Sequence, residues 1–296
     1  MNEQNVKFLE ETLFYLGFGE KLPDQLEAAM KEGKPEFKLQ YNMEHPVPGK
    51  GQGDSVLKDS IQYELNFKKG KDSDMYFFNS YKAELNSHQN GNREQLFYVN
   101  KNKGVTTKEA YNLLSGRAVH KNLVNKEGER YNAWLQLDFS NKDDKGNYLT
   151  SVYHENYGFK LEEALSHLPL KGQKDGLSEQ LVKSLNKGNL TSVTFSEDGK
   201  DVKRYLTANP KYKSIDVFDE NGKPVIYKKN EQQEVKVENV MNTSDKKENG
   251  KEKTSSENNQ SQAIKGAKDG KKNSTKRFKV PRTRMAVGEA GKSMRK

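Results

Sequence analysis

The chain has 296 residues, no cysteine, and 51 Lys and Arg against 42 Asp and Glu. The lack of cysteine excludes disulfide bonds, Cys-ligated zinc and thiol catalysis. No stretch reaches the run of about 18 apolar residues that a membrane helix needs, and the first residues do not resemble a secretory signal, so we expect a cytoplasmic protein with no membrane partner.

Five helices are predicted in chain order, and each has apolar residues at helical spacing on one face. The first is "NVKFLEETLFYLG", with its apolar face at Val6, Leu9, Leu13 and Leu16. The others are a helix that starts at Pro23, one capped at Thr106, a short one over 160–168, and one with Ser178 as N-cap. Thr106 and Glu109 have the spacing of a capping box.

Strand-like runs follow the glycines that close three of these helices, Gly33, Gly116 and Gly188. The runs begin at "EFKLQYNM", "AVHKNLV" and "LTSVTF". Later strands are joined by turn dipeptides such as Asp198-Gly199 and Asn221-Gly222. The pattern predicts an α+β fold of degenerate repeats, each a helix followed by antiparallel strands in hairpins or a meander.

Three regions are expected from this pattern. Residues 1–103 form an N-terminal α+β unit, residues 104–228 two further α+β units, and residues 229–296 a disordered linker and basic tail. The ordered part is expected to end near Tyr227, because residues 230–272 are rich in Lys, Glu, Asn and Ser without periodicity. The pattern leaves open whether the repeats share one core.

Three long motifs resemble an uncharacterised protein family found on conjugative and mobilisable elements of Bacteroidetes. They are "LLSGRAVHKNLVNKEGERYNAWLQLDF", "HENYGFKLEEAL" and "LTANPKYKSIDVFDENGKPV". The resemblance implies a mobile-element setting, near DNA-processing enzymes such as a topoisomerase, and no catalytic residues. The sequence departs from the family pattern at "EHPVPGKGQGDSVLKD", which is read as an insertion that makes the local strand register uncertain.

The residues offer no recognisable catalytic motif. The five histidines, His45, His88, His120, His154 and His167, do not fall at metal-ligand spacing. "GKGQGDS" lacks the order of a phosphate-binding loop. We therefore predict no catalytic residue, metal or cofactor. The remaining enzymatic alternative is a hydrolase or nucleic-acid-modifying enzyme in which His154 meets carboxylates brought close by folding.

One surface patch is suggested by mixed cations and aromatic side chains: Trp134, Lys203, Arg204, Lys211 and Lys213. Trp134 lies on the polar side of "YNAWLQLDF", where it either stacks on a base or partner or is covered by a helix of another repeat; we favour burial. For the lysines and Arg204, the alternative is a solvated strand edge.

The positive charge of the chain is concentrated at its C-terminal end. Residues 245–296 hold 16 Lys and Arg against 6 Asp and Glu, a net charge of +10, so the chain's net charge of +9 leaves −1 for residues 1–244. A mobile basic segment attracts polyanions. The predicted nucleic-acid-binding residues are Lys271, Lys272, Lys276, Arg277, Phe278, Lys279, Arg282, Arg284, Arg295 and Lys296.

The functional prediction is a non-enzymatic accessory protein of a mobile element. Its body binds a protein partner, and its tail binds DNA or RNA without sequence specificity. The alternative is an adaptor or regulator whose tail solubilises the chain or contacts an acidic protein.

Overall fold

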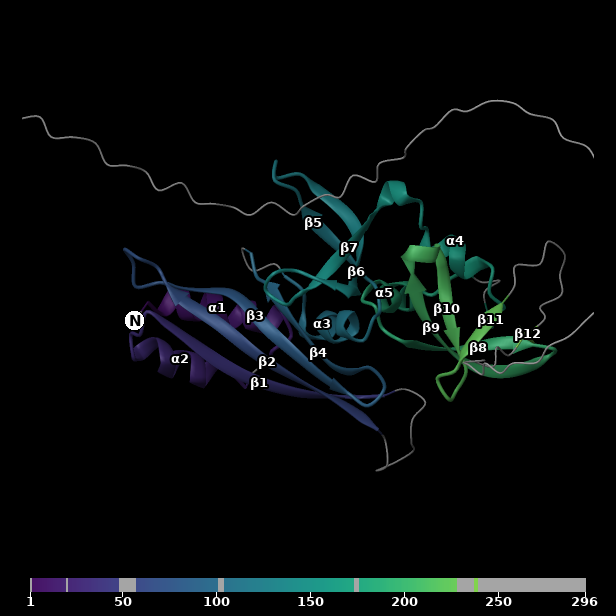
Figure 1. Ribbon diagram of the computed structural model, residues 1–296, viewed down its shortest axis with the longest axis horizontal. Helices are drawn as coiled ribbons and strands as arrows, with labels where there is room; N and C mark the ends of the chain where they lie inside the picture. The colour runs from purple at the N-terminus through teal and green to yellow at the C-terminus, as the bar shows by residue number, and fades with distance from the viewer. Residues whose placement is uncertain are drawn as a thin grey trace, which may run out of the picture. The chain divides into compact units, whose positions relative to one another are not determined.

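A computed structural model describes residues 2–19, 21–47, 57–100, 104–172, 176–227 and, for their backbone alone, 237–238 (Figure 1). Within these residues the protein is α+β, with five α-helices and three antiparallel sheets. The elements occur in three successive groups, each with helices before an antiparallel sheet. The predicted fold class and the helix-then-strands order are therefore confirmed.

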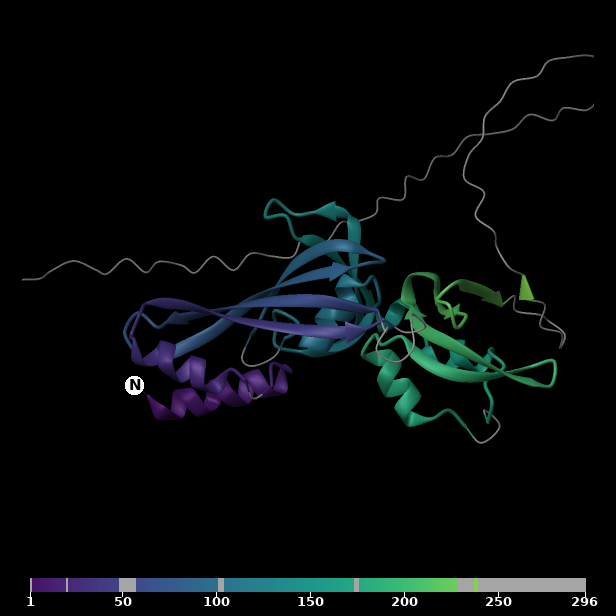
Figure 2. The same ribbon diagram turned by 90° about the horizontal axis from the view of Figure 1, so that it is seen from below.

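The first group contains two helices and a four-stranded sheet of order β1-β2-β3-β4. Its elements are α1 (Glu3–Tyr15), α2 (Pro23–Lys31), β1 (Glu36–Pro46), β2 (Lys58–Lys69), β3 (Tyr76–Ser87) and β4 (Gly91–Tyr98). Both helices lie on the same face of the sheet (Figure 2). The helical face predicted for α1 is the buried one, since Val6, Leu9 and Leu13 are all in the core.

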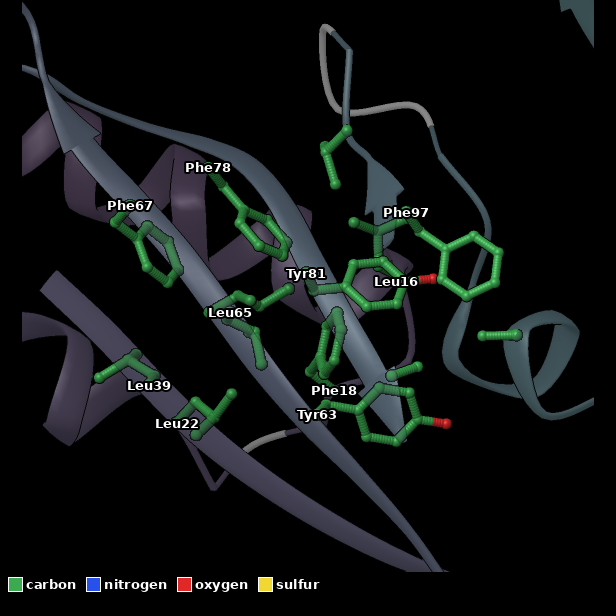
Figure 3. Packing of buried hydrophobic residues seen from close by; sticks show 14 of the residues in the cluster. Leu16, Phe18, Leu22, Leu39, Tyr63, Leu65, Phe67, Phe78, Tyr81 and Phe97 are labelled. Carbon is green, nitrogen blue, oxygen red and sulfur yellow. The ribbon is translucent and has the colours of Figure 1, made fainter. Parts of the chain in front are cut away.

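Aromatic rings fill the core of the first group (Figure 3). Phe18 makes edge-to-face contacts with Tyr63 and Tyr81, with ring centroids 5.5 and 5.3 Å apart. Both tyrosine hydroxyls find acceptors, as buried hydroxyls must: Tyr63 donates to the carbonyl of Thr107, and Tyr81 to that of Val105. These two bonds attach the start of the next helix to the first sheet.

The second group has one helix before a three-stranded meander of order β5-β6-β7. Its elements are α3 (Thr107–Leu114), β5 (Val119–Val124), β6 (Arg130–Lys142) and β7 (Tyr148–His154). The predicted capping box is present, because the Glu109 N–H donates to the Thr106 hydroxyl and the Thr106 N–H donates to the Glu109 carboxylate. A 3-10 helix, η2 (Glu155–Tyr157), and α4 (Leu161–Ser166) lead to the third group.

The third group has α5 before a sheet of order β12-β11-β10-β9-β8. Its elements are α5 (Glu179–Asn186), β8 (Thr191–Glu197), β9 (Lys200–Asn209), the 3-10 helix η4 (Pro210–Tyr212), β10 (Ser214–Phe218), β11 (Pro224–Tyr227) and β12 (Val237–Glu238). Ser178 precedes α5, but its side chain makes no capping hydrogen bond. β12 pairs with β11 inside the predicted linker, so strand pairing continues beyond the expected end at Tyr227.

The buried apolar residues form two clusters, and the second group contributes to both. Leu137 of β6 and Leu113 of α3 belong to the cluster of the first group. Trp134 of β6 and Ala118, just before β5, belong to the cluster of the third group. The packing therefore crosses the boundary predicted near residue 103, and the three-stranded sheet has a core on each face.

Two further sequence expectations have structural outcomes. The three closing glycines, Gly33, Gly116 and Gly188, all adopt the left-handed backbone that ends a helix. The segment read as an insertion is partly strand, because the β1–β2 register runs without a shift to Pro46↔Lys58. Residues 48–56, in the middle of that segment, lie outside the described residues.

Candidate functional site

The ten predicted nucleic-acid-binding residues of the tail, from Lys271 to Lys296, lie outside the described residues. The structure does describe the five residues of the predicted surface patch on the body. It separates them into covered and exposed residues. Trp134 is not a surface residue. Its side chain is only 6% exposed, and its ring makes an edge contact with Phe159, 5.4 Å between centroids. Of the two alternatives for Trp134, an exposed stacking residue or a buried one, the structure shows the buried one.

Arg204 is also not available to a ligand, which corrects its place in the predicted patch. Its guanidinium donates to a Glu197 carboxylate oxygen at 2.8 Å and to the Tyr227 hydroxyl at 3.0 Å, and the Arg204 and Glu197 side chains are both largely buried. Neighbouring residues of a strand point to opposite faces, so Lys203 lies on the other side of β9. Its ammonium is 5.4 Å from the ring centroid of Tyr205.

Lys211 and Lys213 do meet exposed aromatic rings. The Tyr157 hydroxyl of η2 donates to the carbonyl of Lys211 in η4 at 2.9 Å, although the two residues are 54 positions apart. The Lys213 ammonium lies 4.9 Å from the Tyr157 ring centroid, and the Lys211 ammonium 5.4 Å from that of Tyr212. We call Tyr157, Lys211, Tyr212 and Lys213 the tyrosine–lysine patch.

Local chain geometry fixes this patch. The Asn209 side chain accepts from the Tyr212 N–H, and its amide donates to both carboxylate oxygens of Asp216, at 2.9 and 3.0 Å. Lys213 then adopts a left-handed conformation with φ of 52°, which ends η4. On the other segment, Gly158 ends η2 with φ of 83°. Both turns are therefore held by defined hydrogen bonds and backbone geometry.

The patch is exposed and carries unpaired positive charge. Tyr212 is 69% exposed and Tyr157 39% exposed. Within the described part of the chain, neither lysine forms an ion pair closer than 4.0 Å. One carboxylate is nearby: bonds from Asn141 and the Ser140 N–H, with the charge of Lys211, hold the pKa of Asp138 below its ordinary value.

His154 does not assemble an acid–base site with the neighbours that the structure gives it. Its ring stacks on Tyr131, 5.1 Å between centroids, and Glu155 accepts a hydrogen bond from the Asn132 amide. Of the residues that are described, no group of three or more His, Asp or Glu is placed to hold a metal ion. In the same part of the chain, no helix is long and apolar enough to cross a membrane.

A buried polar cluster that the sequence did not indicate lies where the β1–β2 hairpin meets α3. His45 and Asp59, 7% and 3% exposed, are directly opposed in the β1–β2 register. The Tyr111 hydroxyl donates to Asp59 Oδ2 at 3.0 Å, and the His45 ring stacks on the Tyr111 ring at 4.1 Å. His45 Nε2 and Asp59 Oδ1 have no hydrogen-bond partner among the described residues.

Two cations flank Tyr111 and influence His45. The Lys108 ammonium and the Arg117 guanidinium lie 4.9 and 5.1 Å from the Tyr111 ring centroid. Burial, together with the charges of Lys108 and Arg117, lowers the pKa of His45 to about 4. Burial and the charge of Arg117 lower the pKa of Lys108 to about 8. His45 is therefore neutral at pH 7.

Arg117 connects this buried polar cluster to the third group of helices and strands. It donates to the carbonyl of Gly188 at 2.9 Å and to the Asn112 side-chain oxygen at 2.7 Å. The Asn112 amide donates to the carbonyl of Lys187 at 2.6 Å. These bonds satisfy carbonyls at the end of α5, which have no partner within the helix. No short sequence window contains this cluster, because its members span positions 45–188.

A groove lies between α5 and the edge of β8, with a volume of about 620 Å³. Residues 169–171 already pair with part of this β8 edge. The Lys171 N–H donates to the carbonyl of Thr194, and the Ser196 N–H donates to the carbonyl of Pro169. The groove wall combines half-buried apolar residues with hydroxyls: Leu170, Leu177, Leu181, Val193, Ser178, Ser184, Thr191 and Ser192. Such a wall suits an extended peptide.

Comparisons with known proteins found no matching family model, no matching curated protein and no matching solved structure.

Proposed function

We propose that this is a non-enzymatic accessory protein of a mobile genetic element, in which the C-terminal tail binds nucleic acid and the body binds a protein. One observation carries the proposal: the net charge of +10 on residues 245–296, against −1 on residues 1–244. Each phosphate that a tail cation neutralises releases condensed counterions, so binding is driven by charge and carries little sequence preference.

Besides its net positive charge, the tail contains arginine and phenylalanine side chains that can contact phosphates and bases. Arg277, Arg282 and Arg284 can each donate two parallel hydrogen bonds to a phosphate. Phe278 lies among these cations and offers a flat ring to an unpaired base. The nucleic acid is DNA or RNA, since nothing in these contacts depends on a 2′-hydroxyl.

The groove between α5 and β8 supports the protein-binding role of the body. A peptide bound in this groove places apolar side chains against the apolar wall at Leu177 and Leu181. The family resemblance suggests a DNA-processing protein, such as a topoisomerase, as the partner in the cytoplasm. The protein would then tether this enzyme to nucleic acid.

Deleting the tail tests the proposal. The full chain and a chain ending at Ser244 are compared for binding to single-stranded and duplex DNA over a salt series. We expect the full chain to bind both and the shortened chain to lose most of its affinity. Equal binding by both proteins would move the nucleic-acid site to the body. Binding by neither would favour the adaptor alternative, in which the tail contacts an acidic protein.

A further inference from the structure

We infer that the tyrosine–lysine patch binds unpaired nucleotides, so that the body prefers single-stranded nucleic acid. The inference rests on the proposed function, because it assumes that the tail brings the protein to a nucleic acid. It deepens that function by giving the body a binding surface of its own. The motivating geometry is the contact between η2 and η4, which places two exposed rings against two ammonium groups that form no ion pair with the described residues.

The rings are presented on a fixed support. Tyr212 lies at the end of η4, where its N–H is bound by Asn209 and its exposed fraction is 69%. Tyr157 is held by its hydroxyl bond to the Lys211 carbonyl. An aromatic ring on a fixed turn loses little conformational entropy when a flat partner stacks on it, so stacking on these rings is favourable.

The chemistry of the patch selects unpaired bases over a duplex. Bases inside a duplex are already stacked on their neighbours, and only their edges and the phosphates face a protein. A free base exposes its π-face and can stack on Tyr212 or Tyr157. The Lys211 ammonium lies over the Tyr212 ring and the Lys213 ammonium over the Tyr157 ring, where both can neutralise the phosphates that flank a stacked base.

A carboxylate near the tyrosine–lysine patch reduces the positive charge that the patch presents to a nucleic acid. The Asp138 carboxylate near Lys211 is ionised at neutral pH, so the patch is less positive than the tail. Charge alone therefore gives the patch weak attraction to a duplex. Stacking is the larger contribution here, and it is available only to an unpaired base.

The test uses the full chain and its Tyr212→Ala variant, with fluorescent oligo-dT and a duplex of the same length as probes. Removing a stacking ring should weaken binding to oligo-dT by about five-fold to a hundred-fold, while duplex affinity stays within about two-fold. Tyr15→Ala is the matched control, because Tyr15 is 75% exposed on α1 and outside the patch. It should change neither affinity.

A second readout locates the contact without relying on affinity. Oligo-dT that carries a photoreactive 5-iodouracil should crosslink to Tyr212 or Tyr157 in the full chain, with crosslinked peptides identified by mass spectrometry. Tyr157→Phe keeps the ring and removes the hydroxyl bond to Lys211. It should retain crosslinking at Tyr212, and circular dichroism should confirm that each variant is folded.

The outcomes separate this inference from the proposed function. If Tyr212→Ala leaves oligo-dT affinity unchanged, or weakens oligo-dT and duplex binding equally, the inference is overturned while tail binding stands. Crosslinks confined to residues 245–296 would overturn it too. If the wild-type full chain binds neither probe, the proposed function itself fails.

Discussion

Gly188 sits at a junction that has no space for a side chain. A Cβ atom there would lie 2.6 Å from the carbonyl oxygen of Ala118 and 2.9 Å from a methyl group of Val119, and φ is 75°. Both Gly188 and Gly33 end a helix with positive φ, but the position of Gly33 has no atom within 4 Å of an added Cβ. The two glycines therefore share a backbone conformation and differ in the space around their Cα atoms.

Substituting alanine at these two glycines separates backbone strain from crowding. Gly33→Ala should lower the free energy of unfolding by about 1 kcal/mol, the cost of a left-handed alanine. Gly188→Ala should cost about 1–3 kcal/mol more, because the Ala118 carbonyl cannot move aside easily. Chemical denaturation of both variants measures the difference. Equal losses would show that the junction at Gly188 relaxes.

His45 gives the protein a pH dependence with a definite sign. Its pKa falls from 6.5 to about 4 in the folded protein, because of burial and then the charges of Lys108 and Arg117, while Asp59 acts in the opposite direction. The unfolded chain thus binds a proton between these pH values that the folded protein does not. The contribution of His45 to the free energy of unfolding is therefore fully present above pH 6.5 and is lost as the pH falls towards 4.

His45→Phe should reduce this dependence. Phenylalanine keeps the stack on Tyr111 but cannot bind a proton, so the variant should lose about 2 kcal/mol less stability than the wild type between pH 6.5 and 4. Denaturant midpoints at several pH values measure it. Parallel curves for the two proteins would mean that His45 titrates normally in the fold.

Some residue roles were predictable from strand periodicity and others were not. The alternation in β6 correctly separated Trp134 from Leu137, and these residues enter different clusters. In β9 the alternation puts Lys203 and Arg204 on opposite faces, whereas the predicted patch grouped them for their mixture of cations with aromatic side chains. The partner of Arg204, Glu197, lies across a hairpin, and sequence gives no measure of its burial.

At the scale of elements, the two predicted helix caps lead to different expectations. The Thr106 hydroxyl accepts the Glu109 N–H at 3.3 Å, whereas Ser178 makes no capping bond through its side chain. Thr106→Ala should therefore lower the free energy of unfolding by about 0.5–2 kcal/mol. Ser178→Ala, a matched change at the start of α5, should stay within about 0.5 kcal/mol of the wild type. Thermal unfolding of both variants tests this, and a larger destabilisation at Ser178 would contradict the assigned caps.

Helices and hairpins were readable because their signals are local. Apolar spacing, capping residues and closing glycines lie within one element, and the five predicted helices match α1 to α5. The 3-10 helices η2 and η4 were missed, because three residues carry no periodicity. Their contact through Tyr157 and Lys211 joins residues 54 positions apart. The sequence therefore pointed to Lys211 and Lys213 but did not predict that Tyr157 lies beside them.

At the scale of the whole molecule, three helix-and-sheet groups pack into two apolar clusters. The sheet of the second group enters both clusters, and the bonds from Arg117 and Asn112 join α3 to the end of α5. Sequence repeats predicted the three groups. They did not predict how the cores are shared, because that depends on contacts between distant segments.

The division of charge between the body and the tail is the central claim of this account. It is tested most directly by the slope of log affinity against log salt concentration for duplex DNA. We compare the full chain with a variant in which the nine Lys and Arg among the predicted tail residues are replaced by glutamine. The variant's slope should be shallower by about 0.9 for each DNA phosphate that the tail no longer neutralises. An unchanged slope would contradict the account.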